Sequence, residues 1–431
     1  MAVDSPPLED QAGRRAGIVF MTRCTICFGE LMLMGLPRCF YIRGSVCAAL
    51  VFVAAICTAG SAKTEDAPAL LLSTRSIYLK TCGWEPEQLV VHHTGYVPLK
   101  LAFDHQGNLW SGYTTKMLQV VPRTAPELGE QYNLVELSGT PVKCAVRMSL
   151  PTTISSPVAI IISNNNSLLT VANDQLHLID QKDFKEHAAF NLLRPSDQAR
   201  YKIMQSAGRK SLVVVTEGLT KTDSSYTWLD PDTLQVRHTC SYPPFKNYGQ
   251  HIGVRSFADD GRFTELDYDE SRHPVFWLAG GLYCSPKANI PPDHIQPVAV
   301  ILLNSQTAYF LDNLLNDNLP SIVVYDRAGV LLHTVSGHDK ETMAGSNGVV
   351  ISEDGRRVAV AIDITAGGIR WLDISNHVAA RRVDIYDTTT WTRIAEIKLS
   401  SQGEAGLAFS PDGKTLAIQT EDLIQFYDGV P

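Results

Sequence analysis

The stretch Gly406–Asp428, GLAFSPDGKTLAIQTEDLIQFYD, contains three short predicted strands with a tight turn between the first two. Apolar residues alternate with other residues at the two-residue period of a β-strand; they are Leu407, Phe409, Leu416, Ile418, Ile424 and Phe426. Pro411, Asp412 and Gly413 supply a preset φ, a local side-chain hydrogen bond and a positive φ, as a tight reversal requires. Such a unit cannot bury both faces of its own small sheet, so it must stack on copies of itself.

The same turn, lying between two apolar strands, occurs seven times along the chain. The copies are Phe103–Gly107, Ile162–Asn166, Met204–Gly208, Phe257–Gly261, Leu303–Thr307, Ile351–Gly355 and Phe409–Gly413. Their last residues are 42 to 59 positions apart, close to the roughly 40 to 50 residues of a four-stranded propeller blade with its loops. The sequence therefore predicts an all-β fold, a seven-bladed β-propeller of four-stranded antiparallel blades.

A second signal repeats in step with the turns. The third strand of most units ends in an apolar residue followed by aspartate, at Asp180, Asp230, Asp326, Asp387 and Asp428. The seventh unit supplies only three strands, which would leave the edge of its sheet unpaired. The segment Ala69–Cys82 has strand-forming residues but no repeat turn, so we expect it to provide the missing outer strand. The chain's beginning would then close its last blade.

The phrases FSPDGKTLAI at 409–418 and IYDTTTWTRIAEI at 385–397 resemble blades of WD40-like and YVTN-type propellers, and the resemblance covers roughly Ala69–Pro431. Tyr-Asp or Ile-Asp mostly stands where WD40 repeats have Trp-Asp. The resemblance implies the propeller fold. It implies no single function, because such propellers include scaffolds, lactonases, quinone-dependent dehydrogenases and peptidase-associated domains.

The first 62 residues differ from the repeats. Residues 1–33 are interpreted as an upstream extension, with Met32 or Met34 as the start; the alternative is a twin-arginine signal at Arg14 and Arg15. Residues 34–62 have a positive beginning, an apolar core at Val46–Ile56 and small residues before Ala62, which is typical of a signal peptide cleaved between Ala62 and Lys63. The uncharged span 44–62 also allows an uncleaved membrane anchor. Either way we expect an exported, periplasmic or extracellular protein, with 63–431 as a single propeller.

Four cysteines remain after residue 62: Cys82, Cys144, Cys240 and Cys284. An even number in an oxidising compartment indicates disulfides. The order of the repeats favours Cys82 with Cys144 and Cys240 with Cys284, because these pairs fall on neighbouring blades. The alternative is four buried free thiols.

Loops are the expected binding elements of a propeller. The stretch Asp363–Arg382 separates two strands, and its candidates for a binding edge are Arg370, Trp371, His377, Arg381 and Arg382. Tryptophan and arginine often dominate protein interfaces. The alternative is a β-hairpin extension with an ordinary amphipathic surface.

Signals for catalysis are sparse. The chain has no nucleophile elbow, phosphate-binding loop, dinucleotide fingerprint or paired histidines at metal-ligand spacing. We therefore expect a non-catalytic scaffold without cofactor or metal, monomeric, that binds a protein, peptide or glycan. The alternatives are a channel-centred hydrolase of the lactonase type, whose ligands would come from distant blades, and a quinone-dependent redox propeller. A formal net charge of −8 argues against nucleic-acid binding.

Overall fold

The computed structural model describes residues 68–82, 101–114, 131–151, 160–172, 175–192, 200–217, 224–242, 252–268, 274–279, 286–289, 297–303, 305–311, 321–337, 341–343, 348–365, 378–399, 405–420 and 423–431. The chain divides into two compact units, Met1–Asp66 and Ala67–Pro431. All described residues belong to the second unit. Their strands form six sheets of four strands and one sheet of six strands.

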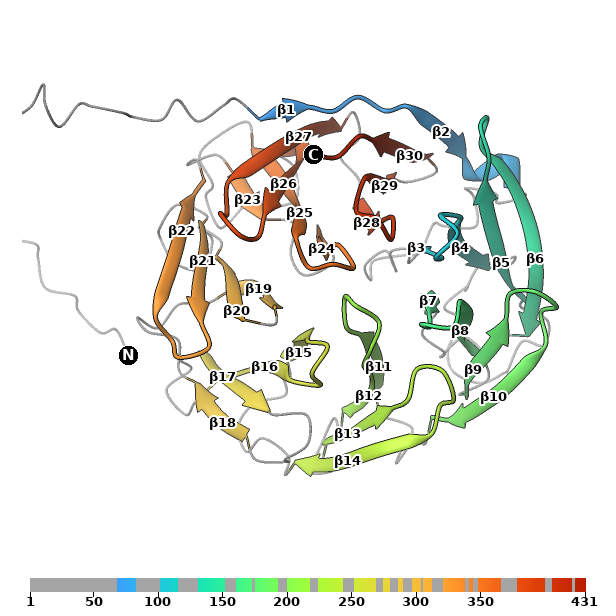
Figure 1. Cartoon of the computed structure of the whole chain (residues 1–431), viewed down its shortest axis with the longest axis horizontal. Coiled ribbons are helices and arrows are strands. Elements are labelled where there is room, and N and C mark those ends of the chain that lie inside the picture. Colours follow the sequence, from blue (N-terminus) through green and yellow to red (C-terminus); the bar gives the residue numbers. More distant parts are fainter. Residues whose placement is uncertain are drawn as a thin grey trace, which may run out of the picture. The chain divides into compact units, whose positions relative to one another are not determined.

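Five of the four-stranded sheets are antiparallel meanders in chain order, with the first strand innermost and the fourth at the rim (Figure 1). Sheet 1 contains β3 (Ala102–Phe103), β4 (Leu109–Thr114), β5 (Gln131–Ser138) and β6 (Lys143–Pro151). Sheet 2 contains β7 (Ile160–Ile162), β8 (Ser167–Ala172), β9 (Gln175–Asp180) and β10 (Glu186–Asn191). Sheet 3 contains β11 (Arg200–Gln205), β12 (Leu212–Glu217), β13 (Ser224–Leu229) and β14 (Val236–Tyr242). Sheet 4 contains β15 (Ile252–Phe257), β16 (Phe263–Tyr268), β17 (Pro274–Ala279) and β18 (Pro286–Asn289), and sheet 5 contains β19 (Pro297–Leu302), β20 (Gln306–Leu311), β21 (Ser321–Asp326) and β22 (Leu331–Ser336).

The six-stranded sheet departs from the expected four strands for two reasons. Its inner position is shared by two short strands, β23 (Glu341–Met343) and β24 (Val349–Ile351), which pair with different parts of β25 (Arg357–Thr365). After β26 (Val378–Asp387) and β27 (Arg393–Leu399), the rim gains a further strand, β1 (Ala69–Leu70), parallel to β27. The prediction of uniform four-stranded blades is therefore wrong for this sheet.

The closing sheet joins the two ends of the repeat region. It contains β28 (Ala405–Phe409), β29 (Thr415–Thr420) and β30 (Leu423–Asp428), and its outer strand is β2 (Arg75–Tyr78), antiparallel to β30. The strand β2 thus completes the last sheet. This confirms the prediction made from the absence of a fourth strand in the seventh unit. A 3-10 turn, η1 (Leu79–Cys82), follows β2.

Residues Ala69–Cys82, called the latch segment below, contact three sheets. β1 pairs with the six-stranded sheet, β2 pairs with the closing sheet, and Cys82 is disulfide-bonded to Cys144 in β6 of sheet 1. The sequence predicted only the second contact and the disulfide. The parallel pairing of β1 was missed because two residues carry no periodic signal.

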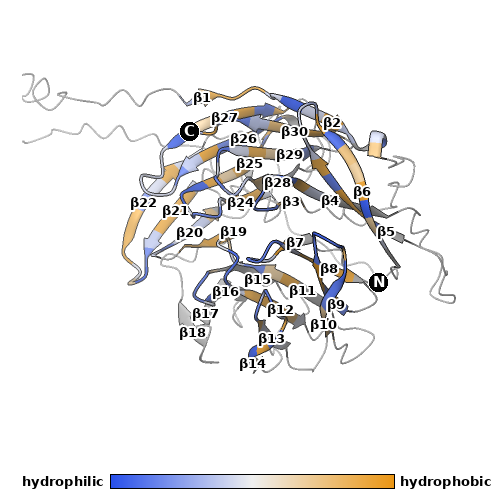
Figure 2. Cartoon of the chain, turned by 45° about the vertical axis from the view of Figure 1, so that its right-hand side comes forward, coloured by the Kyte–Doolittle hydropathy of each residue, from blue (hydrophilic) through white to orange (hydrophobic). Residues whose placement is uncertain are grey.

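The apolar core lies in slabs between neighbouring sheets, since alternate residues of each strand point to opposite faces. Phe103 and Leu109 of sheet 1 pack with Ala417 and Phe426 of the closing sheet. Similar slabs join the closing sheet to the six-stranded sheet, that sheet to sheet 5, sheet 1 to sheet 2, and sheet 2 to sheet 3. Figure 2 shows hydrophobic stretches along the strands and hydrophilic stretches in turns between them. This arrangement is an all-β propeller.

The turns after the first strands have the chemistry that the repeat predicted. In the last sheet the Ser410 hydroxyl accepts from Thr415 N at 2.9 Å and donates to Asp412, and Gly413 has a φ of 68°. Two of the predicted turns are out of register by one residue. In sheet 3 the residue with positive φ is Arg209, not Gly208, and in sheet 5 Gln306 closes the turn, not Thr307.

Turns after the third strands use the repeated aspartate. The Asp387 carboxylate accepts from the Thr389 amide at 2.8 Å, and Asp180, Asp230 and Asp326 act on their own turns in the same way. Three of these turns place a large apolar residue at positive φ: Phe184, Leu234 and Trp391. Such a backbone is strained for these residue types. The burial of Leu234 and Trp391 and the partial burial of Phe184 offset the strain, and the Trp391 indole also donates to Gln306 of sheet 5 at 2.9 Å.

Candidate functional site

Both kinds of turn lie on one face of the propeller, because the first and third strands of a meander run in the same direction. We call this the turn face. It carries the polar residues that the sequence repeats at fixed positions.

Polar contacts on the turn face run from sheet to sheet around the ring. Each contact joins one sheet to the next. They are His105 N to Asn166 Oδ1 at 3.0 Å (sheets 1 and 2), Asn165 N to Asp232 Oδ1 at 3.0 Å (sheets 2 and 3), Gly208 N to Asp259 Oδ1 at 3.0 Å (sheets 3 and 4), Arg262 Nη2 to Leu303 O at 3.3 Å (sheets 4 and 5), Trp391 Nε1 to Gln306 Oε1 at 2.9 Å (sheet 5 and the six-stranded sheet) and Arg357 Nε to Pro431 O at 2.6 Å (the six-stranded and closing sheets). We call this set the interblade belt.

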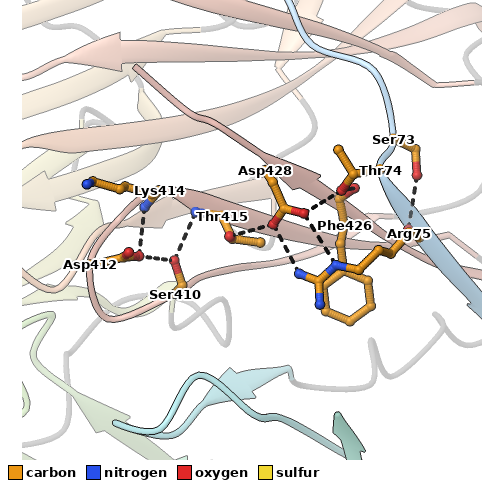
Figure 3. A network of polar contacts seen from close by, with 9 residues as sticks. All are labelled: Ser73, Thr74, Arg75, Ser410, Asp412, Lys414, Thr415, Phe426 and Asp428. Atoms are coloured by element: carbon orange, nitrogen blue, oxygen red, sulfur yellow. Dashed lines mark hydrogen bonds and ion pairs between the residues drawn. The ribbon is translucent and has the colours of Figure 1, made fainter. Parts of the chain in front are cut away.

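The closing sheet is joined to the latch segment at Asp428 (Figure 3). This carboxylate accepts from Thr74 Oγ1 at 2.6 Å, from Arg75 Nη2 at 3.0 Å and from Thr415 Oγ1 at 2.7 Å. Burial alone raises the pKa of the Asp428 carboxyl, but the hydrogen bonds from Thr74, Thr415 and Arg75 outweigh it, so that its pKa lies below the usual range. The Arg75 guanidinium also lies over the Phe426 ring, 4.6 Å from its centroid.

Arg209 connects three sheets at the centre of the turn face. It extends from sheet 3, where it has a φ of 60°, at the place where other turns have Gly107, Asn166 or Gly355. Its Nη2 donates to Phe103 O in sheet 1 at 2.8 Å and lies 3.2 Å from Glu353 Oε2 in the six-stranded sheet. Burial lowers the pKa of the Arg209 guanidinium, and the carboxylates of Glu353 and Asp104 oppose that shift.

Other polar groups near Arg209 have partners of their own. Both oxygens of the buried Asp104 accept hydrogen bonds within its own turn, and one also accepts from Trp110 Nε1 at 2.9 Å. His105 Nδ1 lies 3.9 Å from Glu353 Oε1. One histidine and one carboxylate from different sheets therefore lie near each other, and the Arg209 guanidinium lies beside the same carboxylate.

The comparisons with known proteins bear on the fold. The chain matches no known family model, and no curated protein is significantly similar to it. A chain in the crystal structure of a mitotic checkpoint complex has a similar structure over 86% of this chain and 99% of its own length, with a TM-score of 0.51 and 12% sequence identity. The fold is a WD40-like β-propeller. Identity this low supports the fold of this WD40-like propeller and nothing about its activity.

Two of the predicted binding-loop residues lie in a strand. Arg381 and Arg382 belong to β26, not to a loop, because β25 and β26 extend over nine and ten residues. Arg381 is 5% exposed and pairs with Asp363, its cross-strand neighbour. Arg382 pairs with Glu341 at 2.8 Å and with Asp384 at 2.7 Å. The length of these strands brings both charges into the sheet. Residues 366–377, between the two strands, lie outside the described residues.

Arg382 and the buried Asp384 form an ion pair on β26. Burial raises the pKa of the Asp384 carboxyl, although Arg382 and Arg393 act in the opposite direction. Burial disfavours the charged form of Arg382 too, but Asp384 and Glu341 more than compensate and raise its pKa. These groups therefore satisfy one another inside the sheet.

The other predicted site residues have mixed outcomes. Cys82 and Cys144 form a disulfide, which is the first predicted pair. Cys240, in β14, is also disulfide-bonded, while Cys284 lies outside the described residues. Arg370, Trp371 and His377 lie outside them as well, and so do Ala62, Lys63 and the stretch 44–62. Among the described residues, no helix has the length and apolar composition needed to span a membrane.

One group of possible metal ligands is present in the described part of the chain. Asp180, Asp183 and His187, at the rim of sheet 2, have ligand atoms within 4.8 Å of one another. Asp183 is already paired with Lys185 at 3.0 Å, and His187 Nε2 is 3.2 Å from Asp180. The sequence did not indicate these residues as metal ligands, because their spacing matches no metal motif.

Proposed function

We propose that this protein is an exported, non-catalytic scaffold, a seven-bladed WD40-like propeller that binds a protein or peptide. In this proposal the six-stranded sheet is the sixth blade, with its inner strand divided into β23 and β24 and with β1 added at its rim. The observation that carries the proposal is the interblade belt together with the Arg209–Glu353 pair. These contacts use the polar groups of the turn face to hold the sheets to one another.

A rigid ring suits binding more than chemistry at this face. Binding surfaces gain affinity when they are already ordered, because less conformational entropy is lost on association. The similar solved chain belongs to a mitotic checkpoint complex, which supports a protein as the class of partner. The candidate binding edge is the connection between β25 and β26, through Arg370, Trp371 and His377.

The test is a pull-down with the full chain as bait, comparing the natural sequence with Trp371→Ala. A matched control is Lys414→Ala, a substitution at the turn face, which should leave partner capture unchanged. Equal capture by the Trp371→Ala chain and the natural chain would move the binding edge elsewhere. Loss of capture by both variants would point to a surface spread over both faces.

A channel-centred hydrolase is the second candidate, since His105 and Glu353 do converge. Elemental analysis of purified protein separates the two proposals. Under the scaffold proposal, Glu353→Gln leaves the metal content unchanged. Stoichiometric metal that is lost in Glu353→Gln would favour the hydrolase.

The Cys82–Cys144 disulfide supports export, because such bonds persist in oxidising compartments. Cell fractionation and N-terminal sequencing test this part of the proposal. We expect a mature chain that begins at Lys63, or an intact membrane-bound chain if 44–62 is retained as an anchor. A full-length chain in the cytoplasmic fraction would overturn it.

A further inference from the structure

The outer edge of β30 is a built site for an extended strand. β2 forms an antiparallel ladder with it, in which Ile77 faces Ile424, and the Thr74 amide extends the ladder by donating to Phe426 O at 2.9 Å. Ile77 is 9% exposed and joins the apolar slab between the closing sheet and sheet 1. Main-chain pairing supplies affinity in such strand additions, and side-chain pockets supply specificity.

Specificity at this edge comes from Asp428. At the equivalent place in other sheets, the aspartate caps the turn that leads to the next strand of its own sheet, as Asp387 does. In the closing sheet no such turn is present in the described chain, and Asp428 accepts instead from the Thr74 hydroxyl and the Arg75 guanidinium. The edge therefore selects an extended segment in which a hydroxyl residue and an arginine precede an apolar residue.

We propose that this edge is a strand-acceptor site that also takes the latch segment of a second copy of this chain, giving a strand-swapped dimer. A second copy carries the same Thr74, Arg75 and Ile77, so every contact of the monomer can be made between two chains. The latch segment is connected to sheet 1 through residues 83–101, a length that spans roughly 60 Å when extended. The proposed partner is a second copy because the segment that pairs with this edge in the monomer is part of the same sequence.

The Cys82–Cys144 disulfide keeps each chain's own latch in place. With this bond intact, the end of the latch cannot leave sheet 1. A dithiol reductant opens the bond: each cysteine sulfur gains a hydrogen, and the two thiols of the reductant become its disulfide. After reduction, exchange depends on concentration, since a tethered segment competes at an effective concentration on the order of millimolar.

Isotope mixing tests the proposal with the full chain. Equal amounts of unlabelled and nitrogen-15 chains are reduced, unfolded, refolded together at several concentrations and reoxidised, and the Cys82–Cys144 cross-linked peptides are then weighed. We expect hybrid pairs, one peptide light and one heavy, in a dimer fraction that grows with concentration. Pairs of a single isotope at every concentration would overturn the proposal.

A matched variant distinguishes strand exchange from random oxidation. Asp428→Ala removes the selective contact but leaves both cysteines, so hybrid pairs should fall several-fold in that chain. Hybrid pairs that persist undiminished would mean that cysteines scramble without a seated strand, and the proposal fails.

A second measurement avoids refolding. In a full chain carrying Arg75→Ala and Cys82→Ser, the latch is weakened and the acceptor edge is intact. A synthetic peptide of residues 69–81 should raise the melting temperature of this variant, whereas a peptide with Thr74→Val and Arg75→Gln should not. No rise with the natural peptide at about millimolar concentration, where it matches a tethered segment, contradicts a strand-acceptor site.

Discussion

Removing the Cys82–Cys144 disulfide by changing both residues to alanine should destabilise the propeller by a calculable amount. The bond joins residues 62 positions apart, and for a loop of that length the chain-entropy relation gives about 14 cal/mol/K, or about 4 kcal/mol at 25 °C. The effect acts mainly on the unfolded chain, whose ends become free to separate. Substitution is preferable to a reductant, because Cys240 is disulfide-bonded as well.

Urea unfolding followed by tryptophan fluorescence measures this change, since Trp110 and Trp391 are buried in the described core. With an unfolding entropy near 2.1 cal/mol/K per residue, a loss of 4 kcal/mol lowers the melting temperature of a unit of this size by about 5 °C. Val146→Ala, on the same strand as Cys144 but exposed, is the matched control and should stay within about 0.5 kcal/mol.

An unchanged midpoint in the double variant would refute the reasoning, because the relation depends only on loop length. A separate early transition would mean that the latch segment opens before the remaining sheets unfold. In that case the bond stabilises local closure, and the whole-unit midpoint moves less than calculated.

Three further predictions concern charged groups. A double-mutant cycle with Arg209→Gln and Glu353→Gln should give a coupling energy of about 0.5–3 kcal/mol by urea unfolding, since the two side chains share one contact; strict additivity would mean that the pair does not tie the sheets. Arg382→Leu should lose about 3 kcal/mol by the same assay, because it removes the guanidinium that the buried Asp384 and Glu341 share, and Arg382→Lys should lose less. An unaltered stability would leave Arg382 available for a role in binding. The pKa of the Asp428 carboxyl is lowered in the folded chain, so its contribution to stability is present above the usual carboxyl value of 3.8 and is lost as the pH falls through the folded pKa. The stabilities of Asp428→Asn and the natural chain, measured against pH, should therefore differ at neutral pH and converge in acid. Parallel stability curves would contradict this role of Asp428.

The repeat could be predicted from the sequence because each of its strands and turns is specified by residues a few positions apart. Alternating residues such as Leu416 and Ile418, with Pro-Asp-Gly beside them, specify strand, turn and buried face within one short stretch. Closure by the latch segment was also predictable, since a unit with three strands lacks a fourth. The positive φ at Arg209 was not predictable, because arginine seldom adopts this backbone conformation and its contacts with Phe103 and Glu353 come from distant parts of the chain.

The candidate site shows the same division. The sequence supplied the cysteine pair at 82 and 144, because strand order alone places them on neighbouring sheets. It assigned Arg381 and Arg382 to a loop, because charge in a long connection looks exposed until the length of the strands is known. Their partners Asp363, Asp384 and Glu341 are cross-strand or neighbouring residues that a linear pattern does not bring together.

By itself, the sequence determined the all-β repeat, the turns and the strand that closes the ring, since each depends on residues a few positions apart or on a simple count of strands. Only the tertiary structure decided which polar groups meet across the ring: Arg209 with Glu353, Asp428 with Thr74 and Arg75, and β1 with β27. These contacts join residues far apart in the chain. Their partners are selected by the geometry of sheets packed around a common axis, which no local pattern encodes.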